Sequence, residues 1–276
     1  MIMEMMGYIA ALFIGISLGL IGGGGSILTV PVLVYLFGIN PVLSTSYSLF
    51  VVGSTSLVGA FNNYVKGLVR IKTALLFGLS SIATVFLTRK FLIPLIPDHI
   101  ATIAGLDITE AIVTMVLFAI LMVAASVSMI NNSKQKVAAK AKTDNENVTA
   151  VPERINLPEL SFYGIAIGIA TGLLGAGGGF LLIPTLVLLL KLPMKEAVGT
   201  SLLIIALNSL IGFTGDLGHF TMNWFFLIKI TTIAIAGTFI GGLIAKKISG
   251  NKLRKGFGWF VLIMGIYILT KEICFS

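Results

Sequence analysis

Residues 19–31 read GLIGGGGSILTVP, and residues 172–184 read GLLGAGGGFLLIP. The two stretches correspond at a constant offset of 153 residues, and in each a run of small residues separates an apolar segment from a proline. The correspondence continues from 44–46 to 199–201 at an offset of 155. We therefore predict one unit of roughly 130 residues written twice, with a helix-breaking motif inside each copy.

The composition is that of a membrane protein. Hydrophobic residues make up 57% of the chain and charged residues 11%, and positions 5–65 contain no Asp, Glu, Lys, Arg or His. Helices of soluble proteins need a polar face, which such stretches lack. The N-terminal apolar stretch lacks the basic leading region of a cleavable signal. The single Cys274 excludes an internal disulfide and a thiolate metal cluster.

Two of the predicted apolar segments are too short to cross a membrane. At about 1.5 Å per residue, Ile27–Phe37 and Phe180–Leu190 each reach about 16 Å, roughly half of a hydrocarbon core of about 30 Å. We predict that they are half-helices that begin near the membrane centre. The segments expected in order along the chain are Met5–Ile21, Ile27–Phe37, Val42–Phe61, Ile71–Thr88, Ile108–Ile130, Leu160–Leu174, Phe180–Leu190, Ala197–Phe213, Trp224–Ala245 and Leu253–Thr270.

The loops between segments carry opposite charge in the two copies. Between the third and fourth segments, copy one carries the basic residues of 66–72, whereas copy two carries Asp216 and His219. Between the fourth and fifth segments, copy two carries the basic residues of 246–255, whereas copy one carries the acidic stretch 98–110. Cytoplasmic loops are enriched in Lys and Arg, so equivalent loops are expected on opposite sides of the membrane. The copies are therefore predicted to be inverted.

This inversion requires an odd number of crossings in each copy. The first two segments either cross individually or form a re-entrant hairpin, and both arrangements satisfy the requirement. In either case both termini lie outside, and the linker 131–158 lies in the cytoplasm. Arg89 and Lys90 are discordant with this charge pattern, so we expect them to snorkel or to face a partner.

The predicted fold class is an all-α polytopic membrane protein of two inverted repeats, with glycine-broken half-helices. Each repeat has about five hydrophobic segments, roughly eight to ten in total. Residues 1–130 form the first membrane repeat, 131–158 a flexible cytoplasmic linker, and 159–276 the second membrane repeat. The net charge of +8 lies mostly in the predicted cytoplasmic loops, so no nucleic-acid partner is expected.

The glycine motifs are the predicted binding site. The half-helix starts would present unsatisfied N–H groups and a partial positive charge near the membrane centre. Inverted symmetry would bring the two starts together, which predicts an anion site made of backbone and needing no arginine. The alternative is that the glycines only allow close helix packing. The residues assigned to this site are Gly23, Gly24, Gly25, Ser26, Gly177, Gly178 and Gly179.

Hydroxyl and amide side chains follow each motif. Those at 44–46 and 200–201 lie at the start of the next long segment, where they can cap the helix or donate to oxyanion oxygens. Polar side chains deeper in the segments either bond to other helices or line a pathway. We assign to substrate binding Thr45, Ser46, Thr200, Ser201 and Asn208, and to the pathway Asn62.

Three further residues are candidates for coupling to an ion. Asp216 and His219 fall in the predicted outer loop of copy two, where the alternative to proton coupling is an ordinary solvated position. Lys229 lies within the ninth segment shortly after Trp224, so the alternative to a functional role is snorkelling to the outer interface. No metal site is expected.

The chain resembles the TauE/SafE family, the sulfite-exporter or toluene-sulfonate-uptake type of permease. The resemblance rests on Gly22–Gly25 with Pro31, on Gly175–Gly179 with Pro184, and on the motif 199–202, GTSL. The turn 64–67, YVKG, is a further match, although copy two has Phe220 at the position of Gly67. Copy one has Ser44 and Tyr47 where copy two has Gly199 and Leu202. The resemblance implies a transporter of sulfite, sulfoacetate or related organic sulfonates.

The predicted function is secondary transport of small sulfur-containing anions by alternating access, and not catalysis. An anion channel is the alternative, because half-helices also occur in pores. An intramembrane hydrolase is disfavoured, because Asp216 lacks a second aspartate in another segment and Ser26 would lie far from His219. The expected partners are the anion, the lipid bilayer and a coupling ion, a proton or sodium; a homodimer is one compatible state, and no cofactor is expected. The particular anion, the direction of transport and the coupling ion stay open.

Overall fold

The computed structural model describes residues 2–95, 97, 99–103, 106–140, 157–175, 177–188, 190, 192–244 and 250–274. Within these ranges the chain forms ten α-helices. They are α1 (Ile2–Ile21), α2 (Thr29–Tyr35), α3 (Pro41–Val65), α4 (Ile71–Leu87), α5 (Glu110–Lys140), α6 (Leu157–Leu174), α7 (Gly179–Leu188), α8 (Met194–Asp216), α9 (Trp224–Ile244) and α10 (Gly250–Cys274). The remaining elements are the 3₁₀ helix η1 (Gly24–Leu28), the π-helical turn η2 (Thr88–Leu92), the 3₁₀ turn η3 (Ile93–Leu95) and the strands β1 (His99–Ile103) and β2 (Leu106–Thr109).

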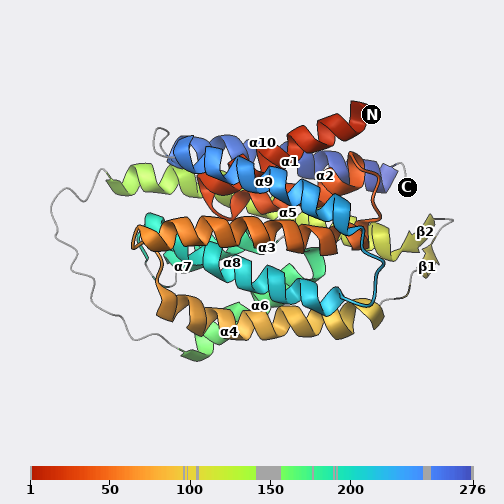
Figure 1. The fold of residues 1–276 in the computed structure, drawn as a ribbon, viewed down its shortest axis with the longest axis horizontal. Helices are drawn as coiled ribbons and strands as arrows, with labels where there is room; N and C mark the ends of the chain where they lie inside the picture. Colours follow the sequence, from red (N-terminus) through yellow and green to blue (C-terminus); the bar gives the residue numbers. More distant parts are fainter. Residues whose placement is uncertain are drawn as a thin grey trace.

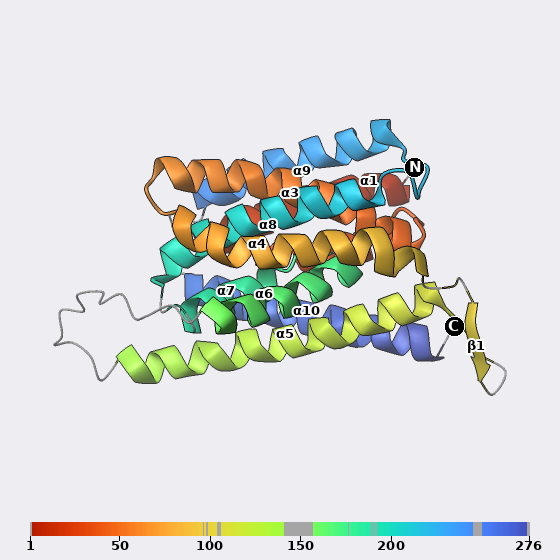
Figure 2. The ribbon, with the colours of Figure 1, turned by 90° about the horizontal axis from the view of Figure 1, so that it is seen from below.

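The helices lie side by side, with their long axes roughly parallel (Figures 1 and 2). One end of this bundle, at the left of both views, carries the connection between α3 and α4. The connection between α8 and α9 lies at the opposite end, where α1 begins, α10 ends and the β hairpin is found. We call these the α3–α4 end and the α8–α9 end. α1 begins and α2 finishes at the same end of the molecule (Figure 1).

The packing is dominated by a few helix pairs. The most extensive contacts join α1 with α9, α3 with α8, and α5 with α10. The next join α4 with both α6 and α8, and α3 with α9. Where α1 crosses α9, a methyl group on Gly237 would collide with the backbone oxygen of Leu12, and one on Gly241 with that of Ile16. Small residues therefore allow the two backbones to approach closely, as in other membrane helix pairs.

Each short helix is enclosed by long ones. η1 and α2 pack through Ile27 and Val30 into an apolar cluster with α5 and α10, which includes Phe118. α7 packs through Leu182 and Leu186 into a second cluster with α3, α4, α6 and α8. Irregular backbone at membrane depth is tolerated only when protein surrounds it or it lines a polar cavity. The two glycine-broken segments satisfy that condition through this packing.

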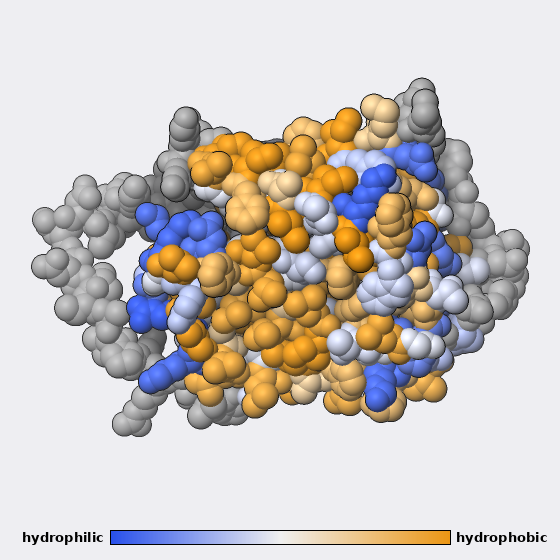
Figure 3. Space-filling model, in the orientation of Figure 1, coloured by the Kyte–Doolittle hydropathy of each residue, from blue (hydrophilic) through white to orange (hydrophobic). Residues whose placement is uncertain are grey.

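The surface has the character expected of a membrane protein. Four helical segments of the described chain are long and apolar enough to cross a membrane, and they span Pro41–Val65, Ile71–Leu95, Lys195–Asp216 and Trp224–Ile244. Large apolar side chains on them are exposed, including Leu79 at 76%. Figure 3 shows hydrophobic residues across the middle of this face and hydrophilic residues gathered toward its two ends. Such a surface fits lipid better than water.

The predicted all-helical class is confirmed, and two segments end later than predicted. The short antiparallel strands β1 and β2 are an addition near the start of the fifth predicted segment, where β-branched residues favour extended backbone. α4 continues beyond the predicted end at Thr88 through the turns η2 and η3 to Leu95. α5 extends to Lys140, into the range predicted as linker. The basic residues of 246–249 lie outside the described residues.

Candidate functional site

The two glycine motifs meet in the structure. A methyl group on Gly23 would collide with the backbone of Gly179, and one on Gly179 with the backbone of Gly23. η1 begins directly after the first of these residues, and α7 begins at the second. The starts of the two short helical segments are therefore in backbone contact, and any side chain at either position would force them apart.

The two motifs have different backbone conformations. Gly22 and Gly175, which correspond in the repeat, both adopt positive φ, at +84° and +64°. In the second motif Gly177 and Gly178 are also left-handed, at +65° and +66°, whereas Gly24 begins a right-handed 3₁₀ helix. A side chain at a left-handed position costs roughly 1–2 kcal/mol from backbone sterics alone. The second motif therefore depends on glycine more strictly than the first.

Buried hydroxyl groups without partners surround these motifs. Ser209 Oγ lies next to Gly177, Thr171 Oγ1 next to Gly178, and Ser17 Oγ next to Gly25. All three oxygens are inaccessible to solvent, and the structure gives none of them a hydrogen-bond partner. An unpaired buried polar group costs about 1–3 kcal/mol. We call the contact of Gly23 with Gly179, together with the rest of the two glycine motifs, the glycine junction. Three unpaired hydroxyl groups beside it indicate a place suited to a polar ligand.

Three of the hydroxyl groups predicted for the site donate their hydrogen to a nearby backbone carbonyl. Ser26 Oγ donates to the carbonyl oxygen of Gly23 (2.7 Å), and Thr45 Oγ1 donates to that of Val42 (2.6 Å). Ser201 Oγ similarly donates within its own helix, to Val198 (2.9 Å). Their hydrogens are used locally, so these groups can offer a ligand only their acceptor lone pairs.

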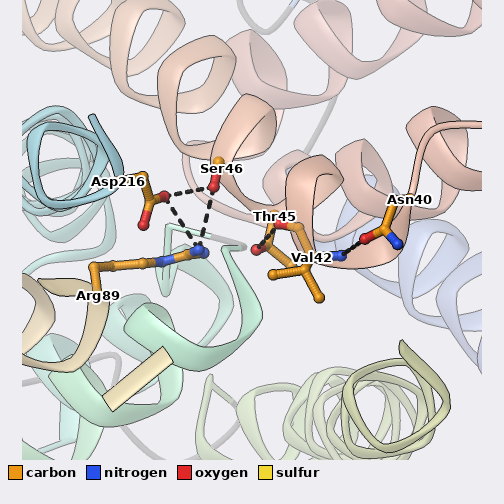
Figure 4. A network of polar contacts seen from close by, with 6 residues as sticks. All are labelled: Asn40, Val42, Thr45, Ser46, Arg89 and Asp216. Carbon is orange, nitrogen blue, oxygen red and sulfur yellow. Dashed lines mark hydrogen bonds and ion pairs between the residues drawn. The ribbon is translucent and has the colours of Figure 1, made fainter. Parts of the chain in front are cut away.

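The capping alternative is wrong for the hydroxyls of α3. Asn40 is the N-cap residue, and its Oδ1 accepts from the backbone nitrogen of Val42 at 2.9 Å (Figure 4). Because α3 begins at Pro41, Thr45 and Ser46 already lie one turn inside the helix. In the second copy Thr200 Oγ1 accepts from the backbone nitrogen of Arg70 (3.0 Å), which ties α8 to the start of α4.

The predicted residue Ser46 belongs to a buried charged cluster. Its Oγ donates to Asp216 Oδ2 at 2.6 Å, and Arg89 Nη1 donates to the same carboxylate oxygen at 3.2 Å (Figure 4). Arg89 Nη1 also lies 3.5 Å from Ser46 Oγ. The side chains of Arg89 and Asp216 are 0% and 1% exposed. We call Ser46, Arg89 and Asp216 the buried triad.

The triad corrects the expectation for Asp216. This residue is not a solvated loop residue, because α8 continues through it and turns its side chain into the bundle. The expectation that Arg89 would snorkel or face a partner is confirmed in its second form, because Asp216 is that partner. Neither residue could be paired from sequence, since both lie just beyond the predicted ends of their segments. Gly215, on α8, lies against the Arg89 stem and leaves room for it.

The other predicted polar residues are not members of the triad, although His219 lies near it, because its backbone nitrogen donates to the carbonyl oxygen of Asp216 at 3.1 Å. Asn208 is buried, and its Oδ1 accepts from Ser81 Oγ at 3.0 Å, while its Nδ2 has no partner. Lys229 is exposed, and its Nζ lies 4.2 Å from the ring centroid of Tyr8. His219 and Asn62 are also exposed. Among the described residues there is no group of three or more His, Cys, Asp or Glu that could hold a metal ion.

A second arginine pair lies at the α3–α4 end. Arg70 Nε donates to Glu196 Oε2 at 2.6 Å, and Arg70 Nη2 donates to Glu196 Oε1 at 3.2 Å. The hydrogen bonds to Glu196 raise the pKa of the Arg70 guanidinium above its ordinary value. This is the two-point geometry in which the Nε–Nη2 edge of an arginine holds both oxygens of one carboxylate.

These features define a multi-pass helical membrane protein whose largely apolar interior contains a close glycine contact and a buried charged pair. The chain belongs to the Sulfite exporter TauE/SafE family, whose model matches residues 8–268. The protein is therefore a membrane transporter and not an enzyme.

Two relatives match over nearly the whole chain, and a third matches over less than half of it. A "Probable membrane transporter protein" of Xylella fastidiosa (strain Temecula1 / ATCC 700964) is 28% identical over 262 residues, which cover 94% of this chain and 92% of the relative. The "Probable membrane transporter protein YdhB" of Bacillus subtilis (strain 168) is 26% identical over 258 residues, with 93% and 96% covered. A "Probable membrane transporter protein" of Methanocaldococcus jannaschii is 35% identical over 118 residues, 41% of this chain and 44% of the relative. No solved structure matches the chain.

Proposed function

We propose that this protein is a secondary transporter of small sulfur-containing oxyanions, such as sulfite, sulfoacetate or related organosulfonates, and that the anion binds at the glycine junction. The observation that carries the proposal is the contact of Gly23 with Gly179, with the unpartnered hydroxyls of Ser17, Thr171 and Ser209 beside it. The family name supplies the sulfite part of the proposal.

The glycine junction favours negative charge. α7 begins at Gly179, so its first backbone N–H groups and the positive end of its dipole lie at the junction. The hydroxyls beside Gly177 and Gly178 are donors that can turn toward oxyanion oxygens. Backbone and hydroxyl donors can bind an anion that they must later release, because each bond is weaker than one to a buried cation.

Alternating access follows from an inverted repeat. In the proposed repeat, α1 to α5 correspond in order to α6 to α10. The counterpart of the helix pair α1–α9 is then α6–α4, and the counterpart of α3–α9 is α8–α4. All four of these helix pairs are among the extensive contacts of the bundle. The connections α3–α4 and α8–α9, which correspond, lie at opposite ends (Figure 1). Two such halves can rock about a central site and open it to either side in turn.

The orientation that we propose places both termini and the α8–α9 end outside, with the linker 131–158 in the cytoplasm. The positive residues of 66–72 support it. Single cysteines in place of Lys66 and His219, in a chain with Cys274→Ser, test it with a membrane-impermeant thiol reagent on intact cells. Labelling is expected only at position 219, and the reverse pattern would contradict the orientation.

Transport in liposomes tests the function. Purified protein is expected to take up radiolabelled sulfite, and unlabelled sulfite inside the liposome is expected to accelerate that uptake by exchange. Imposed proton or sodium gradients identify the coupling ion. Sulfoacetate, thiosulfate and sulfate define the anion class, and neutral dimethyl sulfone should not compete. Uptake without any acceleration by internal sulfite would indicate a channel.

The glycine site has a matched control within the chain. Gly178→Ala places a methyl group against Thr171 Oγ1, at a φ of +66°. Gly38 has the same φ of +66°, but the methyl group of Gly38→Ala would have no neighbouring atom within 4 Å. Both variants carry the same backbone strain of about 1–2 kcal/mol. We expect Gly178→Ala to lose sulfite binding and Gly38→Ala to keep it. A loss of binding in Gly178→Ala that only follows a much lower unfolding temperature would favour the packing alternative.

A further inference from the structure

From the buried triad we infer that Arg89 is a second anion site, in which the Nε–Nη2 edge of its guanidinium binds an oxyanion through two oxygens. The inference rests on the proposed function, because the anion in question is the transported one. Asp216 is then the internal carboxylate that holds Arg89 from the other side.

Within the described part of the chain, the hydrogen bonds of Arg89 all lie on one nitrogen. Nη1 contacts Asp216 Oδ2 and Ser46 Oγ, whereas Nε and Nη2 are buried and have no hydrogen-bond partner among the described residues. A guanidinium has five N–H donors in a fixed plane, and buried charged donors are costly to leave unpaired. The two unpartnered nitrogens are neighbours on a single edge, so one bidentate ligand can satisfy both.

Arg70 shows what that edge binds in this same protein. Its Nε and Nη2 hold the two carboxylate oxygens of Glu196 at 2.6 and 3.2 Å. The ligand that fits the corresponding edge of Arg89 is therefore a planar or pyramidal oxyanion with two accessible oxygens. Sulfite and sulfonates have this form, and so do carboxylates.

The triad is connected to the glycine junction through α3. A methyl group on Gly175 would collide with Thr45, and the next residue, Ser46, bonds to Asp216. Figure 4 shows the head of Arg89 reaching α3 where Thr45 and Ser46 follow one another. Because α8 ends at Asp216, the triad lies toward the α8–α9 end. An anion at Arg89 would thus lie between that end and the glycine junction.

Several charged or titratable groups lie near the proposed anion site and affect how strongly it binds an anion. Asp216 pairs with Arg89, and Glu110 at the start of α5 and His219 in the turn after α8 interact electrostatically with the pair. Lys90 lies beside Arg89 in the chain, with its Nζ 5.4 Å from the ring centroid of Phe86. An incoming anion can bind the free Nε–Nη2 edge without displacing Asp216 from Nη1, but the negative charge of Asp216 opposes its binding. Removing the Asp216 charge should strengthen the anion site at the same time as it leaves Arg89 without its partner.

The opposing charge of Asp216 predicts that an anion rescues the Asp216→Asn variant. Without ligand, Asp216→Asn is expected to unfold at a lower temperature than the unmodified protein, because a buried arginine has lost its carboxylate. Sulfite is expected to raise the unfolding temperature of Asp216→Asn more than that of the unmodified protein, because the bound anion supplies the negative charge that Arg89 has lost and no longer meets the repulsion of Asp216. Dimethyl sulfone, which has no charge, should not do so. Methanesulfonate should act as sulfite does.

The double variant Arg89→Gln with Asp216→Asn separates binding from folding. The double variant has no buried charge in the triad. Its unfolding temperature is therefore expected to lie closer to that of the unmodified protein than the unfolding temperature of Asp216→Asn does. Its sulfite affinity should nevertheless be at least about tenfold weaker than that of Asp216→Asn, because the guanidinium is gone. Arg70→Gln is the matched arginine control, and its sulfite affinity should equal that of the unmodified protein.

The outcomes distinguish the two proposals. If the unmodified protein binds sulfite and the double variant binds it as tightly as Asp216→Asn, Arg89 is not an anion site, while binding at the glycine junction stands. If Asp216→Asn gains no more stability from sulfite than the unmodified protein does, the inference also fails. If no form of the protein binds any sulfur oxyanion, the proposed function fails and this inference with it.

Discussion

Two arginine–carboxylate pairs join the α4 segment to α8, one at each end of the bundle. At the α3–α4 end, Arg70 and Glu196 have side chains that are 60% and 21% exposed. At the α8–α9 end, Arg89 and Asp216 are 0% and 1% exposed. The exposed pair has the better geometry, because two arginine nitrogens reach two carboxylate oxygens. In the buried pair one arginine nitrogen reaches one oxygen.

This difference separates what holds the helices together from what recognises a ligand. Water solvates the exposed pair whether or not it is formed, so its net contribution is small despite the good geometry. The buried pair has lost its water, and its unpartnered donors and acceptor are costly. Imperfect pairing in a buried site is characteristic of places where function, and not stability alone, has set the residues.

Breaking the buried pair should have the largest effect. Arg89→Ala leaves Asp216 as an uncompensated buried charge, and the expected loss is about 3–5 kcal/mol in the free energy of unfolding. Unfolding of purified protein in mixed micelles by a denaturing detergent measures this loss. A cost as small as that of Arg70→Gln would show that water reaches Asp216 and that the triad is not buried in the native protein.

Removing the hydroxyl of the triad should have an intermediate effect. Ser46→Ala deletes a 2.6 Å hydrogen bond to a buried carboxylate, for which we expect a loss of about 1.5–3 kcal/mol. The matched control is Ser201→Ala, at the corresponding position of the second copy, where Oγ bonds only to Val198 in its own helix. The same unfolding titration compares both. Equal losses in the two variants would mean that the bond to Asp216 contributes nothing specific.

Breaking the exposed pair should have the smallest effect. Arg70→Gln is expected to leave the unfolding temperature unchanged within error, because its guanidinium is solvated. The raised pKa of Arg70 keeps its guanidinium charged at neutral pH, so any stabilisation from this arginine is lost only when the pH rises above the ordinary pKa of arginine. Any small effect should vanish in high salt. A large loss that persists in high salt would contradict the contrast between the two ends.

The sequence predicted the helical segments closely where a polar loop precedes an apolar run. α4 begins at Ile71 and α9 at Trp224, as predicted, because charged or polar residues precede each of them. The short helix after each glycine motif was also predicted, from its length and its proline. The far end of α4 was not, because the helix continues through a π turn at Thr88–Leu92 that no local pattern marks. That turn places Arg89 in the bundle.

The candidate site could be predicted only in part. The glycine motifs were visible as repeated strings, and the structure brings them into contact through Gly23 and Gly179. The roles of the hydroxyls were not visible in the sequence. Ser26, Thr45 and Ser201 donate to nearby carbonyl oxygens, while the hydroxyls of Thr171 and Ser209 have no hydrogen-bond partner among the described residues. Whether a hydroxyl has a partner depends on the backbone around it, which residue type alone does not reveal.

The sequence by itself determined the family, the membrane-embedded class, the order of the apolar segments and the two interruptions. These are local properties, since hydrophobic length and glycine runs act over one or two helical turns. Only the tertiary structure decided that Ser46 and Asp216, which lie 170 residues apart, share a hydrogen bond. It also decided that Arg89 is buried beside them. The charge of Arg89 is discordant with the loop pattern of the sequence, yet it belongs to the interior of the folded protein, because burial and pairing are properties of the packed bundle and not of the chain.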